Sequence, residues 1–111
     1  MKITKIQILR VNPTERGWGP LLCRVYTDSG IYGDGEAALN FGNATEACFG
    51  MMQDMAKLII GMDPLHHEAV WQRLYDGCYW SRNGGPVVFA GISAFDIAMW
   101  DIKGKVYGAP L

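Results

Sequence analysis

Two glycines in the first third of the chain stand in a pattern that can bind a dinucleotide. The segment GDGEAA, residues 33–38, matches GxGxxA, and Asp54 follows at about the distance of the acidic residue that contacts a ribose. Such a motif binds a pyrophosphate when it opens a helix inside a parallel βαβ unit. Here the preceding runs predict a hairpin, and residues 39–43 have no regular pattern. We therefore interpret Gly33 and Gly35 as turn residues that let the third strand leave the sheet.

Titratable side chains near the predicted helices favour structural roles over metal or acid–base chemistry. His66 and His67 are adjacent, so on a helix they point about 100° apart and cannot chelate one ion. We interpret both as surface histidines in the first turn of a helix. Asp96 and Asp101 fall on different helix faces, and neither has a second carboxylate at ligand spacing. Because Asp96 lies inside an apolar run, we expect it to have a structural partner.

Loops carry the remaining candidates for binding. The connection at residues 12–20, NPTERGWGP, contains two prolines and two glycines, which predict an exposed loop with Arg16 and Trp18 near its tip. A second irregular stretch, ALNFGN, contains Asn40 and Phe41. Loops carry function more often than helices and strands do, so these polar and aromatic side chains are candidate binding residues.

Composition and charge exclude several classes of partner. The 111 residues have a formal net charge of −1, which provides no basic surface for nucleic acid or anionic lipid. Three cysteines without a CxxC spacing predict free thiols, as in a reducing compartment. The longest apolar run, at residues 87–100, falls short of the ~20 residues that cross a bilayer, and the N-terminus lacks the apolar region of a signal peptide. We expect a cytoplasmic protein that binds neither nucleic acid nor a membrane.

The first third of the chain predicts a sheet. Apolar residues alternate over residues 3–11, and two β-rich runs follow at 21–28 and 30–37. The junction DSG suits a tight hairpin, because Gly30 adopts a positive φ without steric penalty. These features predict a three-stranded antiparallel meander.

Helical periodicity begins near Asn43 and continues to the end of the chain. The three predicted helices span residues 44–60, 64–76 and 87–105. Asn43 with Glu46 fits a capping arrangement for the first helix, and Asp63 before Pro64 fits the start of the second. Most of the six methionines fall at apolar positions and are predicted to be core. The fold class is therefore α+β, a three-stranded antiparallel meander followed by a three-helix bundle, in one domain.

The third predicted helix has no polar face. Between residues 87 and 100 only Ser93 and Asp96 have polar side chains, so every side of the helix needs a cover. Its sequence continues as GISAFDIAMWDIKGKVYGAPL, residues 91–111. This segment resembles the end of the N-terminal capping domain in the mandelate racemase and muconate lactonizing enzyme family of the enolase superfamily. The run LLCRVYTDSGIYGDGEAAL resembles the second and third strands of the same domain.

The resemblance implies a two-domain enzyme. The chain, residues 1–111, would be the capping domain, truncated at or near the start of a (β/α)8-type barrel that holds three carboxylate ligands for Mg²⁺ and the acid–base residues. In such families a base removes the proton α to a carboxylate and the metal stabilises the charge that develops. All those groups would lie beyond Leu111. The third helix would then pack on the other two helices with one face and on the barrel with the other.

The resemblance also implies a substrate class. The most similar members are acid-sugar dehydratases, which eliminate water from aldonates or aldarates, and two loops of the capping domain, here 12–20 and 37–43, close over the barrel mouth. Asn40 stands where mannonate dehydratase-like members have an asparagine that contacts the sugar acid. Arg16 would contact a carboxylate, and Trp18 would exclude water as a lid. The implied substrate-binding residues are Asn40, Arg16, Trp18 and Phe41.

The sequence also departs from the mannonate dehydratases. Their asparagine-glycine-arginine pattern is absent, since Phe41-Gly42-Asn43 follows Asn40, and mannonate itself is therefore not implied. A racemase, an epimerase or a cycloisomerase of the same superfamily is an alternative, because the distinguishing residues lie in the barrel. A non-catalytic α+β interaction module that docks through the helix at 87–105 is another. The expected partners are a sugar acid, the chain's own barrel domain and, as is usual in such families, further copies in a homo-oligomer.

Overall fold

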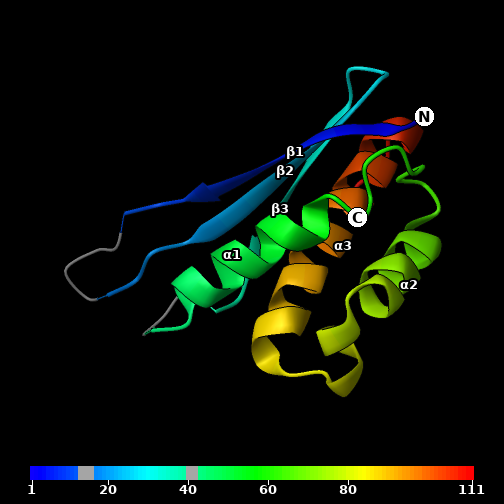
Figure 1. The fold of residues 1–111 in the computed structure, drawn as a ribbon. Helices are drawn as coiled ribbons and strands as arrows, with labels where there is room; N and C mark the ends of the chain where they lie inside the picture. Colours follow the sequence, from blue (N-terminus) through cyan, green and yellow to red (C-terminus); the bar gives the residue numbers. More distant parts are fainter. Residues whose placement is uncertain (13–16, 40–42) are drawn as a thin grey trace.

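The computed structural model describes residues 1–12, 17–39 and 43–111 (Figure 1). Three strands, β1 (Ile3–Arg10), β2 (Leu21–Thr27) and β3 (Tyr32–Ala37), form an antiparallel sheet in the order β1-β2-β3. The helices that follow are α1 (Thr45–Ala56), α2 (His67–Gly77), the 3-10 helix η1 (Tyr79–Asn83) and α3 (Pro86–Tyr107). The described residues thus confirm the predicted α+β class, an antiparallel sheet followed by three α-helices.

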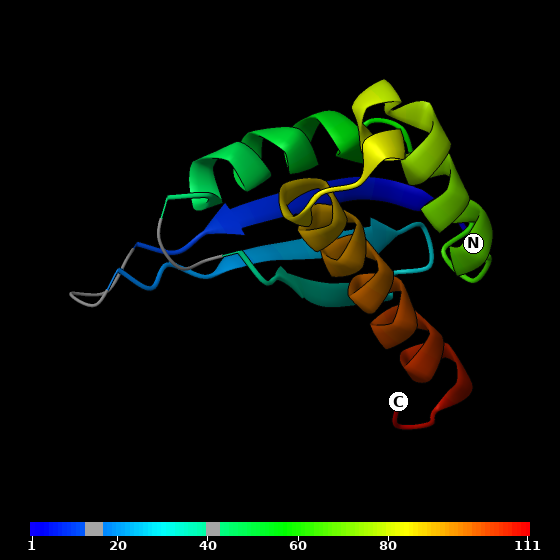
Figure 2. The ribbon, with the colours of Figure 1, turned by 90° about the horizontal axis from the view of Figure 1, so that it is seen from below.

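One face of the sheet is buried beneath the helices, as Figures 1 and 2 show. Along β2, Leu21, Cys23 and Val25 are fully buried, whereas the residues between them are partly exposed. This alternation follows from the two-residue period of a strand, which sends successive side chains to opposite faces. The β2–β3 hairpin turns at Gly30, whose φ of +83° confirms the predicted role of that glycine.

Gly33 and Gly35 lie inside β3, so their interpretation as turn residues was wrong. A Cβ atom at Gly33 would lie 1.9 Å from the carbonyl oxygen of Ala98, and one at Gly35 would lie 1.9 Å from that of Ala94. Both alanines belong to α3, which therefore approaches β3 backbone to backbone. The main partner of α3 is β3, with α1, α2 and β2 contributing less. The expected packing of α3 on the other two helices is present, but the larger contact with the sheet was not predicted.

The first helix is shorter than predicted and lacks the predicted cap. It ends at Ala56, before turns that extend to Gly61, instead of continuing to residue 60. Its N-cap residue is Ala44, with no side-chain capping bond. The carboxylate of Glu46 forms an ion pair with Arg10 of β1, so a contact distant in sequence replaces the local capping arrangement.

The second helix begins at His67, three residues later than predicted. The side chain of Asp63 accepts a hydrogen bond of 2.9 Å from the backbone N–H of Leu65, which closes a tight turn around Pro64 before the helix starts. The third helix starts at Pro86, a favoured first position, and ends where Gly108 adopts a φ of +62°.

The core joins the sheet to all three α-helices. Met52, Met55 and Met99 are buried, which confirms the predicted core role of the methionines, and Phe95 is the largest fully buried side chain. The cysteines are free thiols, as predicted, and burial raises the pKa of Cys23 to about 12. Among the helices of the described ranges, none has the length and hydropathy needed to cross a membrane.

Candidate functional site

The two connections expected to close over a substrate both leave the sheet at the same end of its strands, and the second leads to α1 (Figure 1). In the strand register Arg10 is opposite Leu21, and Leu21 is opposite Ala37. The end of β1, the start of β2 and the end of β3 are therefore neighbours. An antiparallel meander places these ends together, because each strand reverses direction relative to the one before it.

Short-range contacts hold the described flanks of these connections. The backbone N–H of Val11 donates a 3.0 Å hydrogen bond to the carbonyl of Pro20, which closes the first connection at its base. The hydroxyl of Thr45 donates to the carbonyl of Leu39 at 3.3 Å, which closes the second. A hydrogen bond therefore joins the two ends of each connection: the first between β1 and β2, and the second between β3 and α1.

A cavity of about 230 Å³ lies between the two flanks. It is lined by Arg10, Val11, Gly17, Gly19, Asn43, Thr45 and Glu46. A guanidinium, an amide, a hydroxyl and a carboxylate therefore surround a small space, and such groups can hydrogen-bond to a polyhydroxylated ligand. Among the described residues, no group of three or more His, Cys, Asp or Glu side chains is placed to hold a metal ion. The groups that line the cavity are suited to binding a ligand through hydrogen bonds.

The structure places one of the four predicted substrate residues. Trp18 lies between two glycines that line the cavity, and half of its surface, 51%, is exposed. Arg16, Asn40 and Phe41 lie outside the described residues, so their predicted roles stay predictions. Sequence reasoning missed Arg10, because a single arginine at the end of a strand carries no local signal.

Asp96 has a structural partner, as expected, and the structure identifies it as His67. The Nδ1 atom of His67 lies 3.8 Å from Oδ1 of Asp96, and its ring centroid lies 4.4 Å from that of Trp100. On the other side of the ring, Nε2 is 3.5 Å from Nζ of Lys103. The side chain of His67 is only 14% exposed, so its interpretation as a surface histidine was wrong, whereas His66 is exposed. This cluster joins α2 to α3.

Asp101 and Asp34 are structural carboxylates at the free edge of β3. Arg24 binds both oxygens of Asp34, at 2.6 and 2.9 Å, and this pairing lowers the pKa of the Asp34 carboxyl. The carboxylate of Asp101 accepts the backbone N–H of Asp34 at 3.0 Å, and Lys105 donates to the carbonyl of Tyr32 at 2.8 Å. The last turns of α3 therefore satisfy backbone groups of an edge strand that would otherwise be open to pairing.

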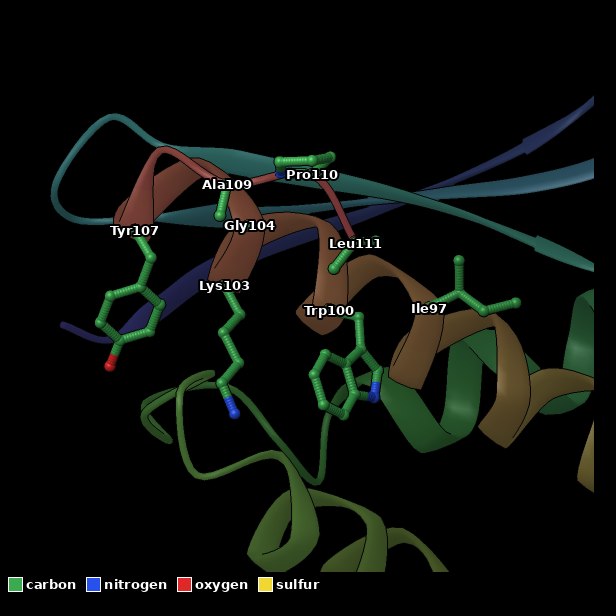
Figure 3. A pocket seen from close by; sticks show the side chains of 8 residues that line it. All are labelled: Ile97, Trp100, Lys103, Gly104, Tyr107, Ala109, Pro110 and Leu111. Carbon is green, nitrogen blue, oxygen red and sulfur yellow. The ribbon is translucent and has the colours of Figure 1, made fainter.

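A larger apolar groove, here called the α3 groove, follows the second half of α3 (Figure 3). Its volume is about 500 Å³. It is lined by Ile97, Trp100, Lys103, Gly104, Tyr107, Ala109, Pro110 and Leu111. The chain turns back after α3, and the N–H of Ala109 donates to the carbonyl of Gly104 at 3.0 Å, so the terminal residues form one wall of the groove.

Comparisons with known proteins give a consistent assignment. The sequence matches the family model of the mandelate racemase / muconate lactonizing enzyme N-terminal domain over residues 19–111. A D-mannonate dehydratase of Novosphingobium aromaticivorans is 40% identical over 111 residues, which cover 100% of this chain and 26% of the relative. A D-galactonate dehydratase family member of Oceanicola granulosus is 41% identical with the same coverage.

Solved structures agree with the sequence matches. An enolase superfamily member from Salmonella Typhimurium superposes with a TM-score of 0.90 and 40% identity, covering 96% of this chain and 27% of that chain. A Zymomonas mobilis protein superposes with a TM-score of 0.92 and 48% identity, with 96% and 27% covered. The chain thus spans about a quarter of the length of these relatives. It belongs to the mandelate racemase and muconate lactonizing enzyme family of the enolase superfamily and has the fold of that family's N-terminal domain.

Proposed function

We propose that the chain is the capping domain of a longer, cytoplasmic, Mg²⁺-dependent acid-sugar dehydratase. The observation that carries this proposal is that the described flanks of the 12–20 and 37–43 connections are neighbours at one end of the sheet, around a cavity lined by hydrogen-bonding groups. Relatives that match the whole chain are named D-mannonate dehydratase and D-galactonate dehydratase family member. Both names contain an aldonate, which supports a sugar acid of that class as the substrate, and the proposal extends to aldarates.

In this proposal the domain binds and encloses the sugar acid while a second domain performs the chemistry. A base takes the proton α to the carboxylate, and the β-hydroxyl then leaves as water with a proton from an acid, which gives an enol. The enol loses its hydroxyl proton and gains a proton at carbon 3, so the product is a 2-keto-3-deoxy acid. Mg²⁺ bound by the second domain supplies positive charge beside the substrate carboxylate. Asn40 and Arg16 hydrogen-bond to the sugar acid, Phe41 also contributes to substrate binding, and Trp18 excludes water as the site closes.

The α3 groove is the surface that the second domain covers in this proposal. Trp100 remains 39% exposed and Tyr107 67% exposed, although both are aromatic. Apolar surface of this kind is stabilised by a partner that removes it from water. Leu111 lies in the wall of the groove, so chain that continues from it starts beside the surface to be covered. The assembled enzyme is proposed to be a homo-oligomer.

The test is an assay of the longer protein with a panel of aldonates and aldarates in the presence of Mg²⁺. We expect formation of a 2-keto-3-deoxy acid from at least one of them. Replacing the lid, Trp18→Ala, should lower kcat/KM roughly tenfold, which corresponds to 1.4 kcal/mol of transition-state stabilisation. Trp80→Ala is the matched control, because Trp80 is 75% exposed on η1 and does not line the cavity.

The result that would refute the proposal is the absence of water elimination from every sugar acid tested. Formation of an epimer without loss of water would instead identify a racemase or epimerase of the superfamily. If dehydration occurs and Trp18→Ala leaves kcat/KM unchanged for all substrates, the 12–20 connection does not contribute to the site.

A further inference from the structure

An ion pair between Arg10 and Glu46 links the residue before the 12–20 connection to the first turn of the helix that follows the 37–43 connection. Arg10 is the last residue of β1, directly before the first connection, and Glu46 lies in the first turn of α1, directly after the second. Their side chains form an ion pair, and the guanidinium carbon of Arg10 also lies 4.7 Å from the ring centroid of Phe49. The arginine is therefore held by a charge on one side and by an aromatic face on the other.

This pair contributes little to the stability of the fold. The side chains of Arg10 and Glu46 are 45% and 72% exposed, and exposed ion pairs are weakly stabilising because water screens them. What the pair does fix is the separation of two segments that are 36 residues apart in sequence. Val11 binds Pro20 and Thr45 binds Leu39, so each connection is closed at its own base. The sheet joins the end of β1 to the start of β2 and the end of β3, and the Arg10–Glu46 contact adds a direct side-chain link from the end of β1 to the start of α1.

We propose that Arg10, Glu46 and Phe49 form a clasp that sets the separation of the end of β1 and the start of α1, the described flanks of the 12–20 and 37–43 connections, and thereby the choice of sugar acid. This inference rests on the proposed function, and it assigns Arg10 and Glu46 as positioning residues. Opening the clasp releases the start of α1 from the end of β1, which changes the shape of the cavity that these flanks line. Substrates that differ in the configuration of a hydroxyl far from the reacting carbons are the ones that such a change affects.

The first experiment measures hydrogen–deuterium exchange in the longer protein, without reference to activity. Arg10→Gln should accelerate exchange in the peptides covering both connections by roughly threefold or more, with the sheet and α3 unchanged. The exchanged pair Arg10→Glu/Glu46→Arg should restore the slower rates. Lys57→Gln is the matched control, because it breaks an exposed ion pair of the same helix region, with Asp54 at 3.3 Å, away from the cavity.

The second experiment measures selectivity as the ratio of kcat/KM for two epimeric sugar acids. Arg10→Gln should change this ratio by roughly tenfold, the exchanged pair should return it toward the wild-type value, and Lys57→Gln should leave it unchanged. A ratio that changes with the melting temperature of each variant, and not with the charge arrangement, would indicate a merely structural role and overturn the proposal.

The two experiments separate failure of the clasp from failure of the proposed function. Unchanged exchange in Arg10→Gln, or an equal effect of Lys57→Gln, overturns the clasp. Faster exchange with an unchanged selectivity ratio overturns its role in substrate choice. If the wild-type protein converts no sugar acid, the proposed function and the link to sugar choice both fall, while the exchange result still decides whether the clasp exists.

Discussion

Adding one methyl group at Gly35 should destabilise the fold severely. A Cβ atom there would lie 1.9 Å from the carbonyl oxygen of Ala94, 3.0 Å from its carbonyl carbon and 3.1 Å from the backbone nitrogen of Ala98. Carbon–oxygen contacts in proteins are about 3.3–3.6 Å, so β3 and α3 would have to separate by more than about 1 Å. All three obstructing atoms belong to the helix backbone, and no change of rotamer can move them away.

The expected cost lies at the upper end of the range for overpacking. Extra atoms in a packed interior destabilise by about 1–3 kcal/mol, and a shift of α3 also loosens the contacts of Phe95 and Ile102 with the core. We therefore expect Gly35→Ala to lower the free energy of unfolding by about 3 kcal/mol, measured by urea titration with far-ultraviolet circular dichroism. For a domain of this size that corresponds to a fall in Tm of roughly 12–24 °C.

Gly50→Ala is a control with the opposite expected sign. Gly50 lies inside α1, and a Cβ atom there meets no atom within 4 Å. Alanine should therefore raise the free energy of unfolding by about 0.5–1 kcal/mol, since it loses less conformational freedom in a helix than glycine. If the free energy of unfolding of Gly35→Ala lies within about 0.5 kcal/mol of the wild-type value, the close backbone contact between β3 and α3 does not require glycine at position 35, and the reasoning is refuted.

Three further predictions concern charge, thiol and surface. Arg24 lowers the pKa of the Asp34 carboxyl, so this pair stabilises the fold above about pH 4, and the stabilisation is lost as the pH falls through the lowered pKa. In urea titrations, the free energy of unfolding of Asp34→Asn should therefore fall less on acidification than that of the wild-type protein. Burial raises the pKa of Cys23 to about 12, so a thiol reagent detected by mass spectrometry should label Cys23 only after unfolding. In sedimentation velocity, Ile97→Lys in the α3 groove should reduce self-association of the isolated chain, whereas Ile60→Lys, at a site of similar exposure, should not.

Sequence reasoning succeeded where a short segment determines its own structure. Alternating apolar residues over 3–11 predicted β1, and the β-rich run at 21–28 predicted β2, because a strand sends successive side chains to opposite faces. Gly30 and Pro86 mark the hairpin and the start of α3 through their own backbone preferences. The order of elements and the α+β class followed from such local signals.

Sequence reasoning failed where a distant residue determines the outcome. Asn43 and Glu46 have the spacing of a capping box, but Glu46 pairs with Arg10 of β1 instead. His67 starts a helix at an apparently exposed position, and Trp100 from α3 covers it. Neither contact has a signature within a window of ten or fifteen residues, since both depend on how α1 and α2 lie against other elements.

The role of the glycines in β3 could have been predicted by comparing two distant segments of the sequence, β3 and α3. Residues 33 and 35 face the same side of the strand, and alanines 94 and 98 face the same side of α3, because strand and helix repeat every two and about every four residues. Two pairs of small residues with matching periods indicate a close helix–strand contact. Of the predicted substrate residues, only Trp18 falls within the described ranges, so most of the candidate site is still a prediction from sequence.

The contact between β3 and α3 also bears on the proposed function. In that proposal the α3 groove rests on the second domain, while the substrate connections extend from the opposite part of the sheet. The position of those connections over a substrate then depends on how rigidly α3 is attached to the sheet. Gly33 and Gly35 bring the two backbones into direct contact, and Asp101 and Lys105 bind the edge of β3. We therefore expect substitutions at this contact to impair substrate selection in the longer protein even where the domain still folds.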